Sequence, residues 1–158
     1  MEFRRIEQKD LNSILVLEKI LYKDPWNEKN FESELSHNDY AYMYVLEENG
    51  VILGYAGFWL SYEYATITKV SINPALQNRG LGFYLFNKII EIAKELGATS
   101  FSLEVRESNL IAQKLYKKAG YQAVGMRKGY YSDGENAIVM IYEEGEEHYE
   151  QVYIGNRE

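Results

Sequence analysis

The chain contains 158 residues, of which 46% are hydrophobic and 26% charged, and its formal net charge at pH 7 is −7. A chain of this length forms one domain that buries roughly 70% of the surface it exposes when unfolded. The absence of cysteine excludes disulfides, thiolate metal sites and a cysteine nucleophile, and the two histidines, His37 and His148, are too far apart in sequence to suggest a zinc site. We therefore expect no metal.

The negative charge is concentrated at the C-terminal end. Residues 143–158 contain six acidic side chains and one arginine, which is −5 of the total charge of −7. We expect one domain over residues 1–142, followed by an acidic tail over residues 143–158. Neither part has the basic face that binds nucleic acid. No segment approaches the roughly 20 apolar residues that cross a bilayer, and the first residues lack the apolar stretch of a signal peptide, so we expect a cytoplasmic protein that does not bind membranes.

Hydrophobic periodicity and turn signals predict the elements in chain order. Ile14, Leu17 and Leu21 form a helical stripe after Asp10, which is a candidate N-cap. The first expected helix begins after Asp10 and ends before Asp24. The other expected helices occupy about 28–35, 81–96 and 109–119. The expected strands occupy about 2–6, 40–47, 51–62, 66–72, 99–105, 121–128 and 136–142. This order predicts a mixed sheet with helices on both faces, in one α/β domain.

A glycine loop precedes the longest predicted helix. It reads Gln77-Asn78-Arg79-Gly80-Leu81-Gly82 and follows a predicted strand. The first turn of a helix has unpaired N–H donors and a partial positive charge, and glycines allow a phosphate to approach them. The loop lacks the third glycine of a dinucleotide fingerprint and the Gly-Lys-Ser/Thr end of a triphosphate loop. It is either an anion cradle or a glycine-assisted turn into a helix.

Glu104, Asn109 and Tyr116 follow this loop in an order that resembles the GCN5-related N-acetyltransferase (GNAT) superfamily. Its acetyl-coenzyme A signature matches Gln77-x-x-Gly80-x-Gly82, and the resemblance covers residues 1–142. Within the superfamily the chain most resembles the ribosomal-protein-alanine N-acetyltransferases, on the basis of Pro25-Trp26 and of the segments 103–109, 115–121 and 130–140. The resemblance implies a single α/β (α+β) domain with a mixed, mostly antiparallel twisted sheet, helices on both faces and a central strand pair that splays apart.

The resemblance also implies that acetyl-coenzyme A is the cosubstrate. The expected acetyl-coenzyme A-binding residues are Val70, Ser71, Ile72, Gln77, Asn78, Arg79, Gly80, Leu81, Gly82, Phe83 and Asn109. In the strand over 70–72 any such role belongs to the backbone, because the side chains of Val70 and Ile72 are expected to pack in the core.

Glu104 and Tyr116 are implied to be the general base and the general acid. An α-amine with a pKa of about 8 is mostly protonated at neutral pH, so a carboxylate that accepts its proton assists attack. A phenol with a pKa of about 10 remains protonated and can donate to a departing thiolate, whose conjugate acid has a pKa of about 8.5. The alternatives are that Glu104 pairs with Arg106 or a lysine at the rim, and that Tyr116 covers the sheet.

Trp26, Tyr130 and Tyr131 are the expected acceptor-binding residues, and the alternative is an aromatic plug between the loops and the core. The resemblance implies that the acceptor is the N-terminal α-amine, with alanine as the first residue, of a ribosomal protein, and that attack is direct, in a ternary complex. A small-molecule amine or a lysine remains an alternative acceptor, and a non-catalytic acyl-coenzyme A sensor is a further alternative. Asn136 departs from the pattern, in which aspartate is more common.

Overall fold

The computed structural model describes residues 1–143, so the expected acidic tail over 143–158 lies outside the described residues except for Glu143. The described chain forms a sheet of seven strands in the order β1-β2-β3-β4-β5-β7-β6. The strands are β1 (Glu2–Arg5), β2 (Ala41–Glu48), β3 (Val51–Ser61), β4 (Tyr64–Ile72), β5 (Ser100–Arg106), β6 (Gln122–Arg127) and β7 (Ala137–Glu143). The α-helices are α1 (Leu11–Leu21), α2 (Glu28–Ser36), α3 (Leu81–Glu95) and α4 (Leu110–Lys118), with 3-10 turns at Gln8–Asp10 and Pro74–Leu76.

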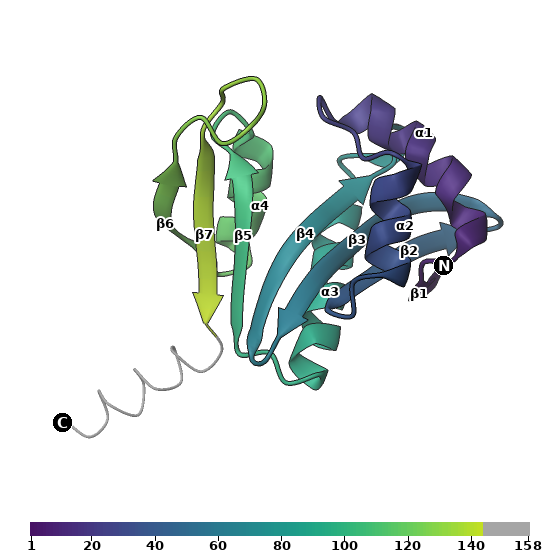
Figure 1. Cartoon of the computed structure of the whole chain (residues 1–158), viewed down its shortest axis with the longest axis horizontal. Helices are drawn as coiled ribbons and strands as arrows, with labels where there is room; N and C mark the ends of the chain where they lie inside the picture. Colours follow the sequence, from purple (N-terminus) through teal and green to yellow (C-terminus); the bar gives the residue numbers. More distant parts are fainter. Residues whose placement is uncertain (144–158) are drawn as a thin grey trace.

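The central strands β4 and β5 are parallel neighbours that separate along their length. They pair at Tyr64, Ala65 and Thr66 of β4, and beyond this point β4 is paired to β3 only. Figure 1 shows the two strands diverging toward the end where β4 runs into the glycine loop. The other neighbouring strands pair in antiparallel fashion. The mixed, mostly antiparallel sheet and its splayed central pair are confirmed.

Helices cover both faces of the sheet, as predicted. α1 and α2 lie over the β1–β4 half on one face, whereas α3 and α4 lie behind the sheet (Figure 1). The α3 side chains Leu85 and Ile89 are fully buried in the larger core, and Phe31 of α2 is fully buried in a second core with Ile14 of α1. Each face therefore has its own apolar core, and the sheet is the wall between them.

A β-bulge at Thr68 changes which side chains of β4 face each core. Gly57 of β3 pairs with Lys69 and Phe58 pairs with Ile67, so Thr68 is the extra residue. Before the bulge, Ala65 and Ile67 pack in the core on the α3 face. After the bulge the parity is reversed, because one extra residue moves every later side chain to the opposite face. Lys69 consequently faces α1.

Asp10 lies at the N-cap position of α1, but its side chain does not cap that helix. Its carboxylate accepts two hydrogen bonds from the Arg4 guanidinium, both 2.8 Å long, and one of 2.8 Å from the Glu7 backbone N–H. The hydrogen bonds from Arg4 lower the pKa of the Asp10 carboxyl. A charged partner on β1 therefore replaces the local capping interaction that the sequence predicts.

The close approach of β3 to β4 requires glycine at position 54. A Cβ there would lie 2.7 Å from the Ser71 carbonyl oxygen and 2.9 Å from Ile72 Cδ1. Gly54→Ala should therefore lower the free energy of unfolding by about 1–3 kcal/mol, the usual cost of overpacking. Urea denaturation measures this change. Gly125→Ala is the matched control, because a Cβ at Gly125 meets nothing within 4 Å, and equal losses in both variants would contradict the packing argument.

Candidate active site

Two cavities lie side by side where β4 and β5 diverge. The first has a volume of about 470 Å³ and lies between the segment after α1, the strands β4 and β5, and α4. The second has a volume of about 430 Å³ and lies between the end of β4, the glycine loop and α4. Four residues line both cavities, namely Val70, Asn109, Ala112 and Tyr116. The two spaces therefore meet at Tyr116, and a ligand in the second cavity can reach the first.

Most of the glycine loop lines the second cavity. Gly80 is the N-cap of α3 with φ of +76°, and no side chain caps the helix. The backbone N–H groups of the first turn and the positive end of the helix dipole suit the oxygens of a diphosphate. At Gly82 a Cβ would make ordinary contact, 3.4 Å from Leu115 Cδ1, so packing alone does not require glycine there. The predicted residues that line the cavity are Val70, Ile72, Gln77, Asn78, Gly80, Leu81, Gly82, Phe83 and Asn109.

Ser71 and Arg79 line neither cavity. The Ser71 side chain is buried and forms a hydrogen bond with the hydroxyl of Tyr22, and Arg79 is exposed. Val70 and Ile72 pair with β3 through one edge of β4, and no pairing with β5 occupies the other edge at these residues. Their backbone groups on that edge can pair with the amides of an extended ligand, while the side chains pack against the larger core as predicted.

Glu104 lies in the first cavity, on the open face of β5. The residues on either side of it, Leu103 and Val105, are buried, and Glu104 alternates to the opposite face. Its carboxylate is 2.9 Å from Nε of Arg127 on β6. A hydrogen bond to the same carboxylate raises the pKa of the Tyr130 hydroxyl. The partner of Glu104 is therefore Arg127 rather than Arg106 or a lysine.

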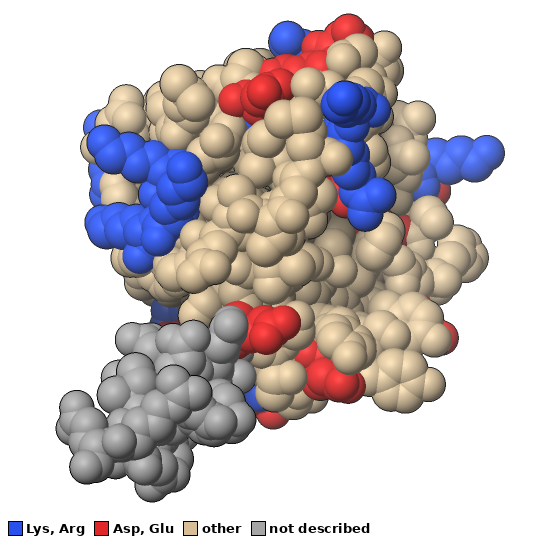
Figure 2. Space-filling view, turned by 90° about the vertical axis from the view of Figure 1, so that its left-hand side faces the viewer, with Lys and Arg blue, Asp and Glu red and all other residues tan. Residues whose placement is uncertain are grey.

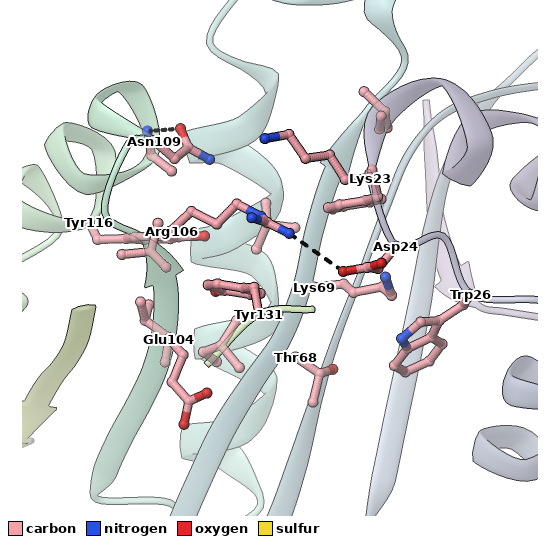
Figure 3. Close-up of a pocket in the computed structure, with 17 residues that line it drawn as sticks. Lys23, Asp24, Trp26, Thr68, Lys69, Glu104, Arg106, Asn109, Tyr116 and Tyr131 are labelled. Carbon is pink, nitrogen blue, oxygen red and sulfur yellow. Dashed lines mark hydrogen bonds and ion pairs between the residues drawn. The ribbon is translucent and has the colours of Figure 1, made fainter. Parts of the chain in front are cut away.

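Tyr116 projects from α4 to the boundary of the two cavities (Figure 3). Its ring packs 5.2 Å from the ring of Phe86 and 6.1 Å from that of Tyr121. Burial raises the pKa of the Tyr116 phenol above its ordinary value, so the hydroxyl stays protonated at neutral pH and can donate a proton. Asn109 caps the same helix by accepting a 3.1 Å hydrogen bond from Ala112 N.

Aromatic side chains from two loops border the first cavity. Trp26 belongs to the α1–α2 loop (residues 22–27) and Tyr131 to the β6–β7 loop (residues 128–136), and both line the cavity. Tyr130 does not line it, and its ring packs against that of Tyr131 at 5.2 Å. Figure 3 shows Glu104 and Tyr116 on one side of the cavity and Trp26 on the other. Tyr131 and the Arg106–Asp24 ion pair lie between these two sides of the cavity (Figure 3).

The two loops are joined by a group of polar contacts that we call the clasp, formed by Lys23, Asp24, Arg106, Ser132 and Asp133. Ser132 Oγ donates a 2.6 Å hydrogen bond to Asp24, and Lys23 Nζ lies 3.3 Å from Asp133. Arg106 donates 3.0 Å hydrogen bonds to Asp133, and its second terminal nitrogen lies 3.6 Å from Asp24 (Figure 3). The clasp therefore connects the two halves of the sheet across the first cavity.

Asn136 ends the β6–β7 loop and does not line either cavity. Its Oδ1 accepts a 2.9 Å hydrogen bond from Gly129 N, and its Nδ2 donates a 3.0 Å hydrogen bond to Glu107. Asn136 therefore holds the loop and does not face either cavity.

Two charged residues beside the first cavity, Glu18 and Lys69, were not expected from the sequence, and Arg106 was considered only as a possible partner of Glu104. Glu18 follows Ile14 by four residues, so it lies on the apolar stripe of α1, and a charge at such a position is a signal of a buried partner. Lys69 could not be placed in the same way, because the bulge at Thr68 reverses the alternation of β4. Figure 3 shows Lys69 on the same side of the cavity as Trp26.

Basic side chains of the described residues form no continuous surface on the face at the β6 end of the molecule (Figure 2). Figure 2, which shows the β6 end of the molecule, has basic side chains in separate groups with uncharged surface between them. Within residues 1–143, no three His, Cys, Asp or Glu side chains lie together in a way that could hold a metal ion. None of the described helices combines the length and apolarity of a membrane span.

The model of the acetyltransferase (GNAT) family matches residues 10–121, which is more than half of the chain. The chain therefore belongs to the GNAT family of acetyltransferases, which use acetyl-coenzyme A as the acetyl donor. This confirms the resemblance that the glycine loop and the residues after it carry.

Two relatives and a solved structure are similar over most of the chain. A Bacillus subtilis protein provisionally assigned as a ribosomal protein bS18-alanine N-acetyltransferase is 41% identical over 138 residues, covering 87% of this chain and 91% of that protein. The ribosomal protein bS18-alanine N-acetyltransferase of Escherichia coli K12 is 31% identical over 138 residues, covering 85% and 92%. The crystal structure of the ribosomal-protein-S18-alanine N-acetyltransferase from Escherichia coli superposes with a TM-score of 0.82 at 30% identity and covers 90% of this chain and 92% of that one.

Asp24→Ala should loosen the clasp without unfolding the protein. Exposed polar pairs contribute little to global stability, so we expect the free energy of unfolding to change by less than about 0.5 kcal/mol. Local opening should increase, because the variant removes the contacts of Asp24 with Ser132 and Arg106. Hydrogen exchange should accelerate at the amides of residues 128–136. The control is Asp39→Ala, at an exposed position before β2, and equal exchange in both variants would show that the clasp does not restrain the loop.

Proposed function

We propose that this protein transfers acetyl from acetyl-coenzyme A to the N-terminal α-amine of ribosomal protein bS18, with alanine as the first residue. The observation that carries the proposal is the meeting of two cavities at Tyr116, with a glycine loop at one end and Glu104 at the other. The names of the bS18-alanine N-acetyltransferases, which are similar over most of both chains, support the choice of acceptor.

Acetyl-coenzyme A supplies the acetyl group as a thioester when it is bound. The first turn of α3 and the loop before it, residues 77–83, would hold the diphosphate, since the backbone donors there suit phosphate oxygens. The free edge of β4 at Val70 and Ile72 would pair with the amides of the pantetheine arm. Asn109 lines both cavities and would lie beside the same arm. Ser71 and Arg79 retain at most a backbone or peripheral role, because neither lines the cavity.

Glu104 acts as the general base. The α-amine of a peptide has a pKa of about 8 and is mostly protonated at neutral pH, so a carboxylate within reach of it favours attack. Glu104 lies in the first cavity, and the Arg127 guanidinium fixes the direction of its carboxylate at 2.9 Å. It receives the proton of the amine directly or through one water molecule.

Tyr116 acts as the general acid. Its phenol lies at the boundary of the cavities, and burial raises its pKa, so the proton is present throughout the neutral pH range. It donates that proton, or a hydrogen bond, to the sulfur as the thiolate departs. No residue of this chain needs to carry the acetyl group, because the amine attacks directly in a ternary complex.

The acceptor N-terminus enters the first cavity between Trp26 and Tyr131. An extended peptide suits a space bordered by aromatic side chains and unpaired strand edges. Tyr130 packs against Tyr131 and acts at the entrance rather than inside. We assign these functions to a catalytic domain over residues 1–142, with the acidic segment over 143–158 as an appendage to it.

The acceptor is tested with the purified protein, acetyl-coenzyme A and three acceptors. These are a peptide with the N-terminal sequence of bS18 that begins with alanine, the same peptide with a blocked α-amine and a free lysine, and a polyamine. We expect thiol release with the first peptide alone, and mass spectrometry should place the acetyl group on its α-nitrogen. Acetylation confined to the lysine or the polyamine would refute the acceptor, and no thiol release with any acceptor would favour an acyl-coenzyme A sensor.

Glu104→Gln and Tyr116→Phe should each lower kcat by about 10²–10⁴-fold, the usual contribution of a positioned acid or base. Both variants preserve shape, so calorimetry should show acetyl-coenzyme A binding within about twofold of the wild type, a difference that corresponds to only about 0.4 kcal/mol. Steady-state thiol release measures the loss of kcat.

The matched controls are Glu95→Gln, at an exposed position in α3, and Tyr121→Phe. The Tyr121 hydroxyl is buried and has no hydrogen-bond partner within the described residues, although its ring lies 6.1 Å from that of Tyr116. Loss of this hydroxyl should leave kcat unchanged and should not destabilise the protein. An equal loss of kcat in Tyr116→Phe and Tyr121→Phe would remove the evidence for an acid at position 116.

A further inference from the structure

Glu18 is a fully buried carboxylate that three donors surround. Lys69 Nζ on β4 and the backbone N–H of Trp26 both donate to its Oε1 at 2.9 Å, and the Tyr55 hydroxyl on β3 donates to its Oε2. A buried charge requires this degree of compensation. Glu18 therefore joins α1, the sheet and the α1–α2 loop at one point.

Lys69 is the cation of this pair and lies at the wall of the first cavity. Its side chain is 8% exposed, and its Nζ lies 4.3 Å from the centre of the Tyr22 ring and 4.4 Å from that of the Trp26 ring. Burial lowers the pKa of the Lys69 ammonium, against the opposing effect of Glu18. The cation–π contacts attach both aromatic side chains of the loop to β4.

We propose that Glu18 and Lys69 are positioning residues that hold the α1–α2 loop, and Trp26 above all, in the place where the loop forms one wall of the acceptor cavity. The inference rests on the proposed function, in which that cavity receives the acceptor N-terminus. Trp26 is held twice, by its backbone N–H on Glu18 and by its ring over Lys69. The pair thereby sets the affinity for the acceptor.

The contacts of Glu18 and Lys69 predict that their substitution weakens binding of the acceptor and not of acetyl-coenzyme A. Neither Glu18 nor Lys69 lines the second cavity, and their loop partners, Tyr22 and Trp26, line only the first. An apolar pair of similar volume would stabilise the fold at least as well as a buried ion pair. The charges of Glu18 and Lys69 therefore supply directional contacts to the α1–α2 loop rather than additional stability of the fold.

The first test is Lys69→Met, which keeps an unbranched apolar stem, one atom shorter than that of lysine, and removes the charge. The KM for the alanine peptide should rise about tenfold, because the variant loses the cation–π contacts and the hydrogen bond of Lys69 that hold the loop. The KM for acetyl-coenzyme A should stay within about twofold. Lys19→Met is the matched control, because Lys19 is adjacent to Glu18 in sequence but lies on the exposed side of α1.

A spectroscopic measurement follows the loop without relying on activity. The chain has two tryptophans, so Trp59→Phe leaves Trp26 as the sole tryptophan fluorophore. In this background Lys69→Met should shift the Trp26 emission to longer wavelength and increase its quenching by acrylamide, because the ring leaves its place over β4. Lys19→Met should change neither property.

A double variant separates positioning from stability. Lys69→Met leaves Glu18 as an uncompensated buried charge, whereas Glu18→Gln with Lys69→Met removes both charges. The double variant should recover most of the thermal midpoint that Lys69→Met loses, while the KM for the peptide and the quenching of Trp26 remain raised. Recovery of all three properties together would mean that the pair serves only the fold, and would overturn the proposal.

The outcomes also separate this inference from the proposed function. If the wild type acetylates no α-amine, the proposed function fails, and the Trp26 fluorescence still reports whether the pair holds the loop. If the wild type acetylates the peptide but Lys69→Met raises neither its KM nor the quenching of Trp26, the positioning inference fails alone. An equal rise in both KM values would also overturn it.

Discussion

The structure depends on the separation of two neighbouring strands. β4 and β5 share three paired positions and then diverge, so the later half of β4 keeps one edge of its backbone unpaired. In a closed sheet this edge would be filled by β5, and neither cavity would exist. The strand, the glycine loop after it and α4 then surround a space in which backbone donors and acceptors face a ligand. This fold therefore leaves part of its sheet unpaired, with a free backbone edge where a ligand can pair.

A strand pair that diverges must be held by other contacts, and two sets of contacts at the first cavity do this. The clasp connects the α1–α2 loop to the β6–β7 loop through exposed, polar groups. The pair of Glu18 and Lys69 connects the same α1–α2 loop to the sheet through buried, charged groups. The two differ in strength, because solvent screens the clasp and not the buried pair. The α1–α2 loop is thus held strongly where Trp26 contacts the buried pair and weakly where Lys23 and Asp24 form the clasp.

Local sequence signals predicted the helices and strands well. They failed where a residue distant in sequence determines the partner of a side chain. The glycine loop before α3 and the apolar stripe of α1 after Asp10 are short-range patterns, and the structure has both. Asp10 lies at a helix N-terminus, but its carboxylate pairs with Arg4, because a guanidinium on the neighbouring strand is a stronger partner than a backbone N–H.

The candidate site was predicted in the same uneven way. The glycine loop and the places of Glu104 and Tyr116 at the first cavity follow from the motif, whereas Arg127 as the partner of Glu104 follows from the pairing of β6 with β7. The bulge at Thr68 has no signal in the sequence, and without it Lys69 would point into the other core.

Asn136 shows what one amide can do that a carboxylate of the same shape cannot. It accepts from Gly129 with its oxygen and donates to Glu107 with its nitrogen. An aspartate has no donor when ionised, so at this position it would place two negative oxygens at hydrogen-bond distance from each other. The isosteric exchange is therefore coupled to the residue at 107: this chain tolerates glutamate there because position 136 is neutral, and the two positions are expected to vary together.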